Sequence, residues 1–180
     1  MNAHGRSTSE AAQAITIEMN KLGFDVYYDH GDPSNSFVGT IPVSTEEELT
    51  SKNQISQLDI AIVERKTHKA VALIEIEEKA DIPKTLIGDV FTTLLGESVH
   101  LPIRENKAEV GNWTTLIIIG KDLGHEDRNA SICNLANKVK YALGTENSKI
   151  GNIVIEAFSV NNPLKDVLME KIKEAIQRRA

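Results

Sequence analysis

Cysteine is nearly missing from this chain: Cys133 is the single one among 180 residues. One cysteine excludes an internal disulfide and any metal site built from several cysteines. The chain also lacks a run of about eighteen apolar residues and an apolar signal-peptide region near its N-terminus. From these absences we expect a soluble, cytoplasmic protein.

Motifs of several large enzyme classes are missing as well. The sequence contains no internal repeat, no low-complexity tract and no glycine-rich phosphate loop. No Ser-His-Asp or Cys-His arrangement occurs in a motif that would support nucleophilic catalysis. The chemistry of this protein therefore has to be sought in other side chains.

Positive charge is in short supply too, since 20 Lys and Arg stand against 26 Asp and Glu, for a net charge of −6. Binding to phosphates depends on Lys and Arg, so this balance argues against a nonspecific, avid DNA binder. The length and a hydrophobic content of 41% suit one α/β domain with a substantial core. We expect a single domain over residues 1–180.

The sequence does have three acids in two neighbouring strand-like segments, QLDIAIVE and AVALIEIEE. Asp59 lies in the first segment, and Glu75 and Glu77 lie in the second. The two-residue period of a strand places both glutamates on one face together with Val71 and Leu73. The acids therefore continue an otherwise apolar stripe, which indicates that they are half-buried.

The segment between the two strands, RKTHK, is short enough for an antiparallel hairpin. Pairing Arg65 with Lys69 across a three-residue loop would set Asp59 directly opposite Glu75. A shift of one residue would break this alignment. Three neighbouring carboxylates repel one another, and a hard cation such as Mg²⁺ removes that penalty. The pattern outlines a divalent-metal site.

A plainer interpretation is that these acids form the solvated outer face of an edge hairpin. Arg65, Lys66 and Lys69 would then be their cross-strand partners. The apolar neighbours of the acids favour the metal site over this alternative, because a solvated face normally alternates polar residues along its whole length.

Asp59, fifteen intervening residues and then Glu75-x-Glu77 resemble the core of the PD-(D/E)xK, or restriction-endonuclease-like, nuclease superfamily. The core of that family runs helix, three strands, helix, strand, and this sequence offers the same order over about residues 8–120. Two positions depart from the family pattern: Leu58 replaces a proline, and Glu77 replaces a lysine. Some type II restriction endonucleases also have Glu-x-Glu and are active.

The resemblance implies an α/β fold with a mixed central sheet flanked by helices. It places the αβββαβ core within about residues 8–120 and leaves an αβα extension over about 121–180. It also implies that Asp59, Glu75 and the peptide carbonyl of Ile76 hold Mg²⁺ or Mn²⁺. Glu77 would ligate a second metal or act as general base toward water.

Two further residues are candidates for this implied site. The first helix of the family often contributes an acid, and Glu18 falls inside the expected apolar stripe of the helix over about 8–22, with Glu10 as the second choice. Lys84 would supply the cation that Glu77 displaced, by polarising a phosphate oxygen or orienting the attacking water. Lys79 is the alternative.

The expected function is therefore a metal-dependent endonuclease that hydrolyses DNA phosphodiester bonds. Cutting a duplex would favour a homodimer, because two sites then face opposite strands. One alternative is a catalytically inactive module of the same fold that binds nucleic acid or a protein partner. Another is an unrelated α/β domain whose acidic hairpin is only surface.

Around this core, FDVYY is expected to form a first strand, followed by a polar excursion over about 29–52. His30 and Asp32 lie in that excursion without a third ligand at a fixed spacing, so a turn is favoured over a metal pair. A helix is predicted from Pro83, a buried strand at TTLIIIG, a helix over about 127–143, a strand at NIVIEAFSV and a final helix over 163–179. This alternation predicts parallel strands joined by helical crossovers.

Overall fold

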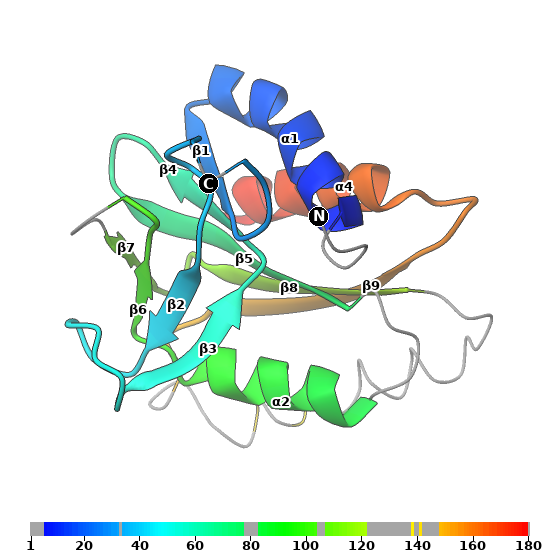
Figure 1. Ribbon diagram of the computed structural model, residues 1–180. Coiled ribbons are helices and arrows are strands. Elements are labelled where there is room, and N and C mark those ends of the chain that lie inside the picture. Colours follow the sequence, from blue (N-terminus) through cyan, green and yellow to red (C-terminus); the bar gives the residue numbers. More distant parts are fainter. Residues whose placement is uncertain are drawn as a thin grey trace.

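The computed structural model describes residues 6–32, 34–77, 83–103, 107–121, 138, 141 and 148–179, and for residues 6, 83–87 and 89 it describes the backbone alone. In this part of the chain the fold is mixed α/β, with one nine-stranded sheet of parallel and antiparallel strands flanked by helices (Figure 1). The expected fold class is confirmed at this level. None of the described helices is long and apolar enough to cross a membrane.

The helices that the structure describes from end to end are α1 (Arg6–Lys21), α2 (Pro83–Leu94) and α4 (Leu164–Arg178). The strands are β1 (Phe24–Tyr28), β2 (Ile41–Ser44), β3 (Gln54–Leu58), β4 (Ile60–Glu64), β5 (Lys69–Glu77), β6 (Ser98–His100), β7 (Lys107–Glu109), β8 (Thr115–Lys121) and β9 (Asn152–Phe158). Of the helix predicted over about 127–143, only Lys138 and Tyr141 are described, and both are helical.

The main arm of the sheet begins with antiparallel pairs, β1 with β4 and β4 with β5. It continues with parallel pairs, β5 with β8 and β8 with β9. A parallel pair needs a crossover connection, and α2 lies in the chain between β5 and β8. The predicted parallel strands are therefore confirmed. A smaller arm joins β2 to β3 and β6, and β6 to β7.

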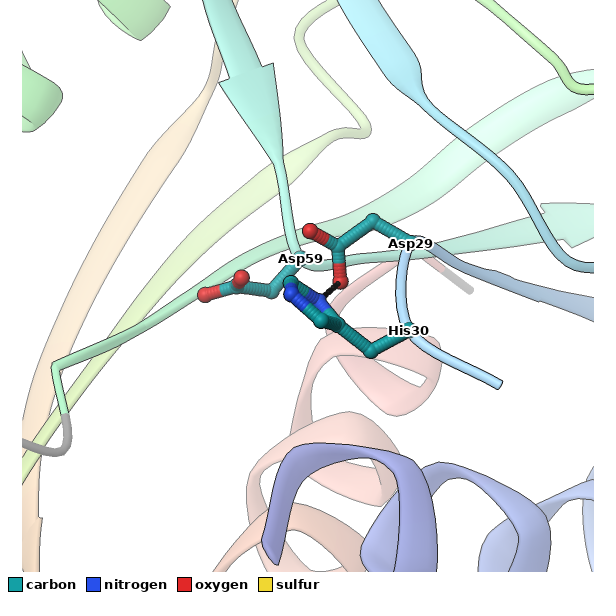
Figure 2. A group of neighbouring side chains, drawn as sticks. All are labelled: Asp29, His30 and Asp59. Carbon is teal, nitrogen blue, oxygen red and sulfur yellow. Dashed lines mark hydrogen bonds and ion pairs between the residues drawn. The ribbon is translucent and has the colours of Figure 1, made fainter. Parts of the chain in front are cut away.

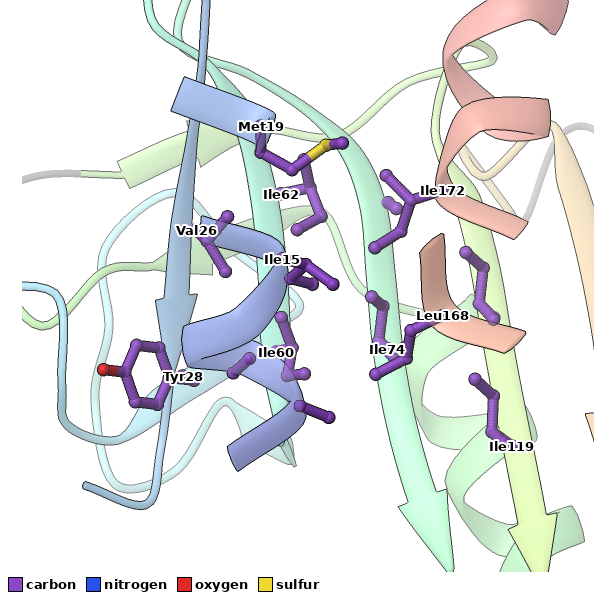
Figure 3. Packing of buried hydrophobic residues seen from close by; sticks show 14 of the residues in the cluster. Ile15, Met19, Val26, Tyr28, Ile60, Ile62, Ile74, Ile119, Leu168 and Ile172 are labelled. Atoms are coloured by element: carbon purple, nitrogen blue, oxygen red, sulfur yellow. The ribbon is translucent and has the colours of Figure 1, made fainter. Parts of the chain in front are cut away.

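Helices cover both faces of the sheet: α1 and α4 lie on one face and α2 lies on the other (Figure 1). Under α1 and α4, a cluster of buried side chains fills the space to the sheet. Figure 3 shows Ile15 of α1 and Leu168 of α4 packed against Ile60 and Ile74 of the central hairpin. A second cluster, on the α2 side, includes Leu73, Leu94 and Ile118. The continuous apolar runs of β5 and β8 are explained by burial on both faces.

The single strand expected over QLDIAIVE is wrong, because the structure has two strands separated by a bend at Asp59. β3 leaves the main arm and pairs with β2, whereas β4 stays between β1 and β5. The polar excursion over about 29–52 also contains a strand, β2. β2 and β3 belong to the smaller arm, which lies on the α2 side of the β4–β5 hairpin.

The register of the β4–β5 hairpin differs from the one we expected at the turn. Glu64, not Arg65, pairs with Lys69 across a four-residue turn, and an irregularity between Ile62 and Val63 then shifts the register by one. Val71 is the extra residue of this bulge. Beyond it Ile60 pairs with Ile74, the last pair of the two strands, and Asp59 bonds to the backbone of Ile74 and Ile76, on either side of Glu75. Val71 itself faces the α1 and α4 side, contrary to the strict alternation we expected.

Candidate functional site

Asp59 lies at the bend between β3 and β4, half-buried beside the end of β5. Its backbone N–H donates to the carbonyl of Ile74 over 3.2 Å. Its carboxylate Oδ2 accepts the backbone N–H of Ile76 at 2.6 Å. Because the backbone turns away from β5 here, a side chain instead of a carbonyl satisfies this strand N–H. The contact fixes the Asp59 carboxylate against the backbone of Ile76.

Glu75 lies inside the protein with only 8% of its surface exposed. Its Oε1 accepts a hydrogen bond from Ser56 Oγ of β3 at 3.2 Å. Ser56 in turn accepts one from Thr93 Oγ1 of α2, also at 3.2 Å. This chain of hydroxyls ties β5 to β3 and α2 and holds the carboxylate on the α2 side of the sheet. The expectation that the acids of the hairpin are not a solvated face is met for Glu75.

Glu77 is the last residue of β5 and is half-buried. The strand period places it on the same face as Glu75, and it pairs with Gly120 of β8. Ile76, between the two acids, is 7% exposed and packs in the cluster under α1 and α4. Lys84 is the second residue of α2, and its side chain lies outside the described part of the structure, as does all of Lys79.

The structure does not bring Glu18 to this region. Its Oε1 accepts from Lys173 Nζ of α4 at 2.9 Å, and its side chain is 49% exposed. The Lys173 ammonium lowers the pKa of the Glu18 carboxyl below its ordinary value. The buried stripe of α1 runs through Ala12 and Ile15, so Glu18 lies outside it. Glu18 forms an ion pair between α1 and α4 on the surface, and Glu10 is exposed too.

The basic residues of the hairpin turn do not pair with Asp59, Glu75 or Glu77 in the bonds that the structure shows. Arg65 donates to Asp25 at 2.7 Å and to Asn20 at 3.1 Å. The Lys69 ammonium lies 4.0 Å from the ring centre of Trp113, a cation–π contact. The turn lies at the opposite end of β4 and β5 from Asp59, so its charged side chains make contacts within the fold at that end of the hairpin.

A different group does gather around Asp59. Asp29 and His30 follow β1, and one ligand atom each from Asp29, His30 and Asp59 lie within 4.8 Å of one another (Figure 2). Among the described residues this is the one group of three or more His, Cys, Asp or Glu that meets this distance. Glu75 and Glu77 are therefore not gathered with Asp59 into such a group.

The sequence pattern does not reveal this group, because no third ligand follows His30 at a fixed spacing along the chain. Asp32 does form the predicted turn, with its carboxylate accepting the N–H of Ser34 at 2.9 Å. The third side chain comes instead from the bend before β4. The antiparallel pairing of Tyr28 with Ile60 is the signal that would have found it, because this pair brings Asp29 next to Asp59.

Comparison of the chain with protein-family models, with curated proteins and with solved structures finds no match. The resemblance to the nuclease superfamily therefore depends on the residues and the topology of this chain alone.

Proposed function

We propose that this protein is a divalent-metal-dependent endonuclease that hydrolyses DNA phosphodiester bonds. The observation that carries the proposal is the pair of backbone contacts by which Asp59 bonds to Ile74 and Ile76, on either side of Glu75, at the end of the β4–β5 hairpin. Glu77 follows on the same face, where β5 ends beside the parallel strand β8. In open α/β sheets, ligands bind at the carboxyl ends of the strands, and Glu75 and Glu77 lie at that end of β5.

The order of elements along the main arm supports the same proposal. Without the β2, β3, β6 and β7 arm, the chain runs α1, β1, β4, β5, α2, β8. That order is helix, three strands, helix, strand, and the first three strands are antiparallel neighbours while the fourth is parallel to the third. It agrees with the restriction-endonuclease-like core that the motif implies, and β9 and α4 would belong to the C-terminal extension.

The residues present fit a hard cation, because Asp59, Glu75, Glu77 and the carbonyl of Ile76 all offer oxygen. A bound Mg²⁺ or Mn²⁺ would lower the pKa of its water and offset the charge that builds on the phosphate. Asp59 and Glu75 would hold this ion. Glu77 would bind a second one or take the proton of the attacking water, and Lys84 is the candidate to polarise a phosphate oxygen or orient that water.

The experiment compares wild type with Asp59→Asn and Glu75→Gln on supercoiled plasmid, single-stranded DNA and branched DNA in Mg²⁺ or Mn²⁺. Glu47→Gln is the matched control, since it removes one negative charge from a side chain that is 83% exposed. Cleavage by wild type and the control, lost in the other two variants, would support the proposal. Equal cleavage by all four would reveal a contaminating nuclease.

A second candidate function is the inactive module of the same fold, which binds nucleic acid or a protein partner. One observation favours it: within the described chain, Glu75 and Glu77 do not join Asp59 in a group of ligand atoms within 4.8 Å. Absence of cleavage by every preparation, together with DNA binding measured by fluorescence anisotropy, would select this function. Size-exclusion chromatography with light scattering, with and without DNA, tests the proposed homodimer under either function.

A further inference from the structure

Asp29, His30 and Asp59 come together from two loops that the sheet holds side by side. Asp29 follows β1 directly and Asp59 precedes β4, and these two strands are antiparallel partners. The backbone N–H of Asp29 donates to the backbone carbonyl of Asp59 at 3.0 Å, which extends the pairing to the two acids themselves. The positions of both aspartates are therefore set by the strand ladder.

The side chains of the two aspartates are also held in place. The Asp59 carboxylate is fixed by the N–H of Ile76 at 2.6 Å. The Asp29 side chain is only 8% exposed, and its Oδ1 bonds to Nδ1 of His30. The His30 side chain is 46% exposed, so solvent reaches the group from its side. A site whose ligands are already fixed by their surroundings loses little freedom when an ion binds.

The imidazole separates this group from an ordinary cluster of acids. Figure 2 shows the His30 ring beside both carboxylates, with its Nδ1 bonded to Asp29. A divalent cation that replaces the proton between His30 Nδ1 and the Asp29 carboxylate can be bound by both, with the Asp59 carboxylate as its third ligand.

The mixed donor set indicates which kind of cation fits. Imidazole nitrogen suits transition cations such as Zn²⁺, Fe²⁺ and Ni²⁺, whereas sites for Mg²⁺ and Ca²⁺ are built from oxygen. One nitrogen with two carboxylates is a set for a divalent transition cation, including Mn²⁺ and Co²⁺. The two negative charges match the charge of such an ion.

We propose that Asp29, His30 and Asp59 form a binding site for a divalent transition cation. The site shares Asp59 with the proposed nuclease centre but includes neither Glu75 nor Glu77, and it needs no hydrolysis to exist. This inference therefore goes beyond the proposed function.

The test is isothermal titration of wild type, His30→Asn and His68→Asn with Zn²⁺, Co²⁺ and Mg²⁺. His68 is the matched control, because it is an exposed histidine in the β4–β5 turn with φ 54°, a conformation that asparagine tolerates. We expect His30→Asn to weaken Zn²⁺ and Co²⁺ binding by about tenfold or more, the effect typical of losing a residue that serves a metal site. Mg²⁺ binding should be unchanged, and His68→Asn should behave as wild type.

Cobalt adds a readout that is independent of affinity. The visible absorption of bound Co²⁺ depends on its ligands, so His30→Asn should change or abolish the wild-type spectrum. Asp29→Asn is the second variant, and it should weaken Co²⁺ binding in the same direction. Zn²⁺ and Co²⁺ binding that is the same in wild type and His30→Asn would overturn the proposal, as would an equal loss in His68→Asn.

The outcomes distinguish this site from the nuclease proposal. Glu75→Gln and Glu77→Gln should retain Co²⁺ binding even where they abolish DNA cleavage. If wild type cleaves no DNA but His30→Asn still loses Co²⁺, the nuclease proposal fails and the metal site stands. If cleavage depends on Glu75 while His30→Asn leaves every cation bound, the metal site fails and the nuclease proposal stands.

Discussion

The bond from the Ile76 N–H to the Asp59 carboxylate gives Asp59 a structural duty that does not depend on any metal. Asp59→Ala removes the acceptor of the backbone N–H of Ile76, a residue that is 7% exposed. A hydrogen bond to a charged group contributes roughly 1.5–3 kcal/mol, and an unsatisfied buried donor costs a similar amount. We therefore expect Asp59→Ala to lower the free energy of unfolding by about 2 kcal/mol in EDTA.

Asp59→Asn is the control that separates the acceptor from the charge. Asparagine keeps a carbonyl oxygen at the same reach, so it should retain most of the bond, while both variants remove the same negative charge. For a chain of this size a loss of about 2 kcal/mol corresponds to a Tm lowered by roughly 4–8 °C. Urea denaturation and thermal melts of the three proteins measure the difference.

Equal unfolding free energies for Asp59→Ala and Asp59→Asn in EDTA would contradict this expectation. Added Mn²⁺ gives the second comparison, because a cation that binds only the folded state raises the Tm by mass action. Both variants should lose this increase, since neither keeps the carboxylate. An Asp59→Asn protein that is nearly as stable as wild type in EDTA, but whose Tm does not rise with Mn²⁺, would show that the Asp59 side chain has two separate roles. One is the hydrogen bond to the Ile76 N–H, and the other is binding of the cation.

Three further predictions concern stability. Arg179 lowers the pKa of the Glu64 carboxyl below its ordinary 4.5, so the ion pair stabilises the fold above pH 4.5 and this stabilisation is lost as the pH falls through the folded-state pKa. Arg179→Gln should flatten the pH dependence of the unfolding free energy, measured with urea, in that range. An unchanged pH dependence would contradict the ion pair. Burial lowers the pKa of His100 below 6.5, so the folded state binds fewer protons than the unfolded state and wild-type stability should fall as the pH drops below 6.5. His100→Gln should reduce this loss. The same pH dependence of the unfolding free energy in the variant and in wild type would argue against the burial effect. Ile74→Ala, at a fully buried site, should lower the unfolding free energy by about 2–5 kcal/mol in chemical denaturation. Ile17→Ala, at a site that is 67% exposed, should lower it by less than about 0.5 kcal/mol. Similar losses in the two variants would count against the packing under α1.

Much of the fold could be predicted from residue periodicity, because the elements with long apolar patterns are those that are buried. β1, β5, β8, β9, α2 and α4 lie within a few residues of where the sequence places them. β6 and β7 were missed since each has three residues, too few to show a period. The bend at Asp59 was missed because the apolar pattern of QLDIAIVE continues through it and nothing local in that pattern marks a change of partner.

In the site, too, contacts within one hairpin could be predicted from the sequence, whereas contacts between segments far apart in the sequence could not. That Asp59 lies beside the segment of β5 around Glu75 could be predicted, because the two segments are neighbours in one hairpin. The turn was one residue longer than expected, and the bulge at Val71 restored the register. Glu18 was misplaced since the face of α1 that is buried depends on where α4 packs. His30 could not be joined to Asp59 without knowing that β1 pairs with β4.

The mixture of antiparallel and parallel pairs also bears on the order in which the chain folds. β4 and β5 are joined by a short turn, so bringing Asp59 beside the backbone of Ile74 and Ile76 requires the closure of a small loop only. β8 and β9 must each return by a crossover before they pair, and such distant contacts form slowly. Until β8 arrives, β5 exposes an apolar edge that another chain could pair with. The part of the sheet that carries the acids should thus form first and should depend on the later strands for protection from aggregation.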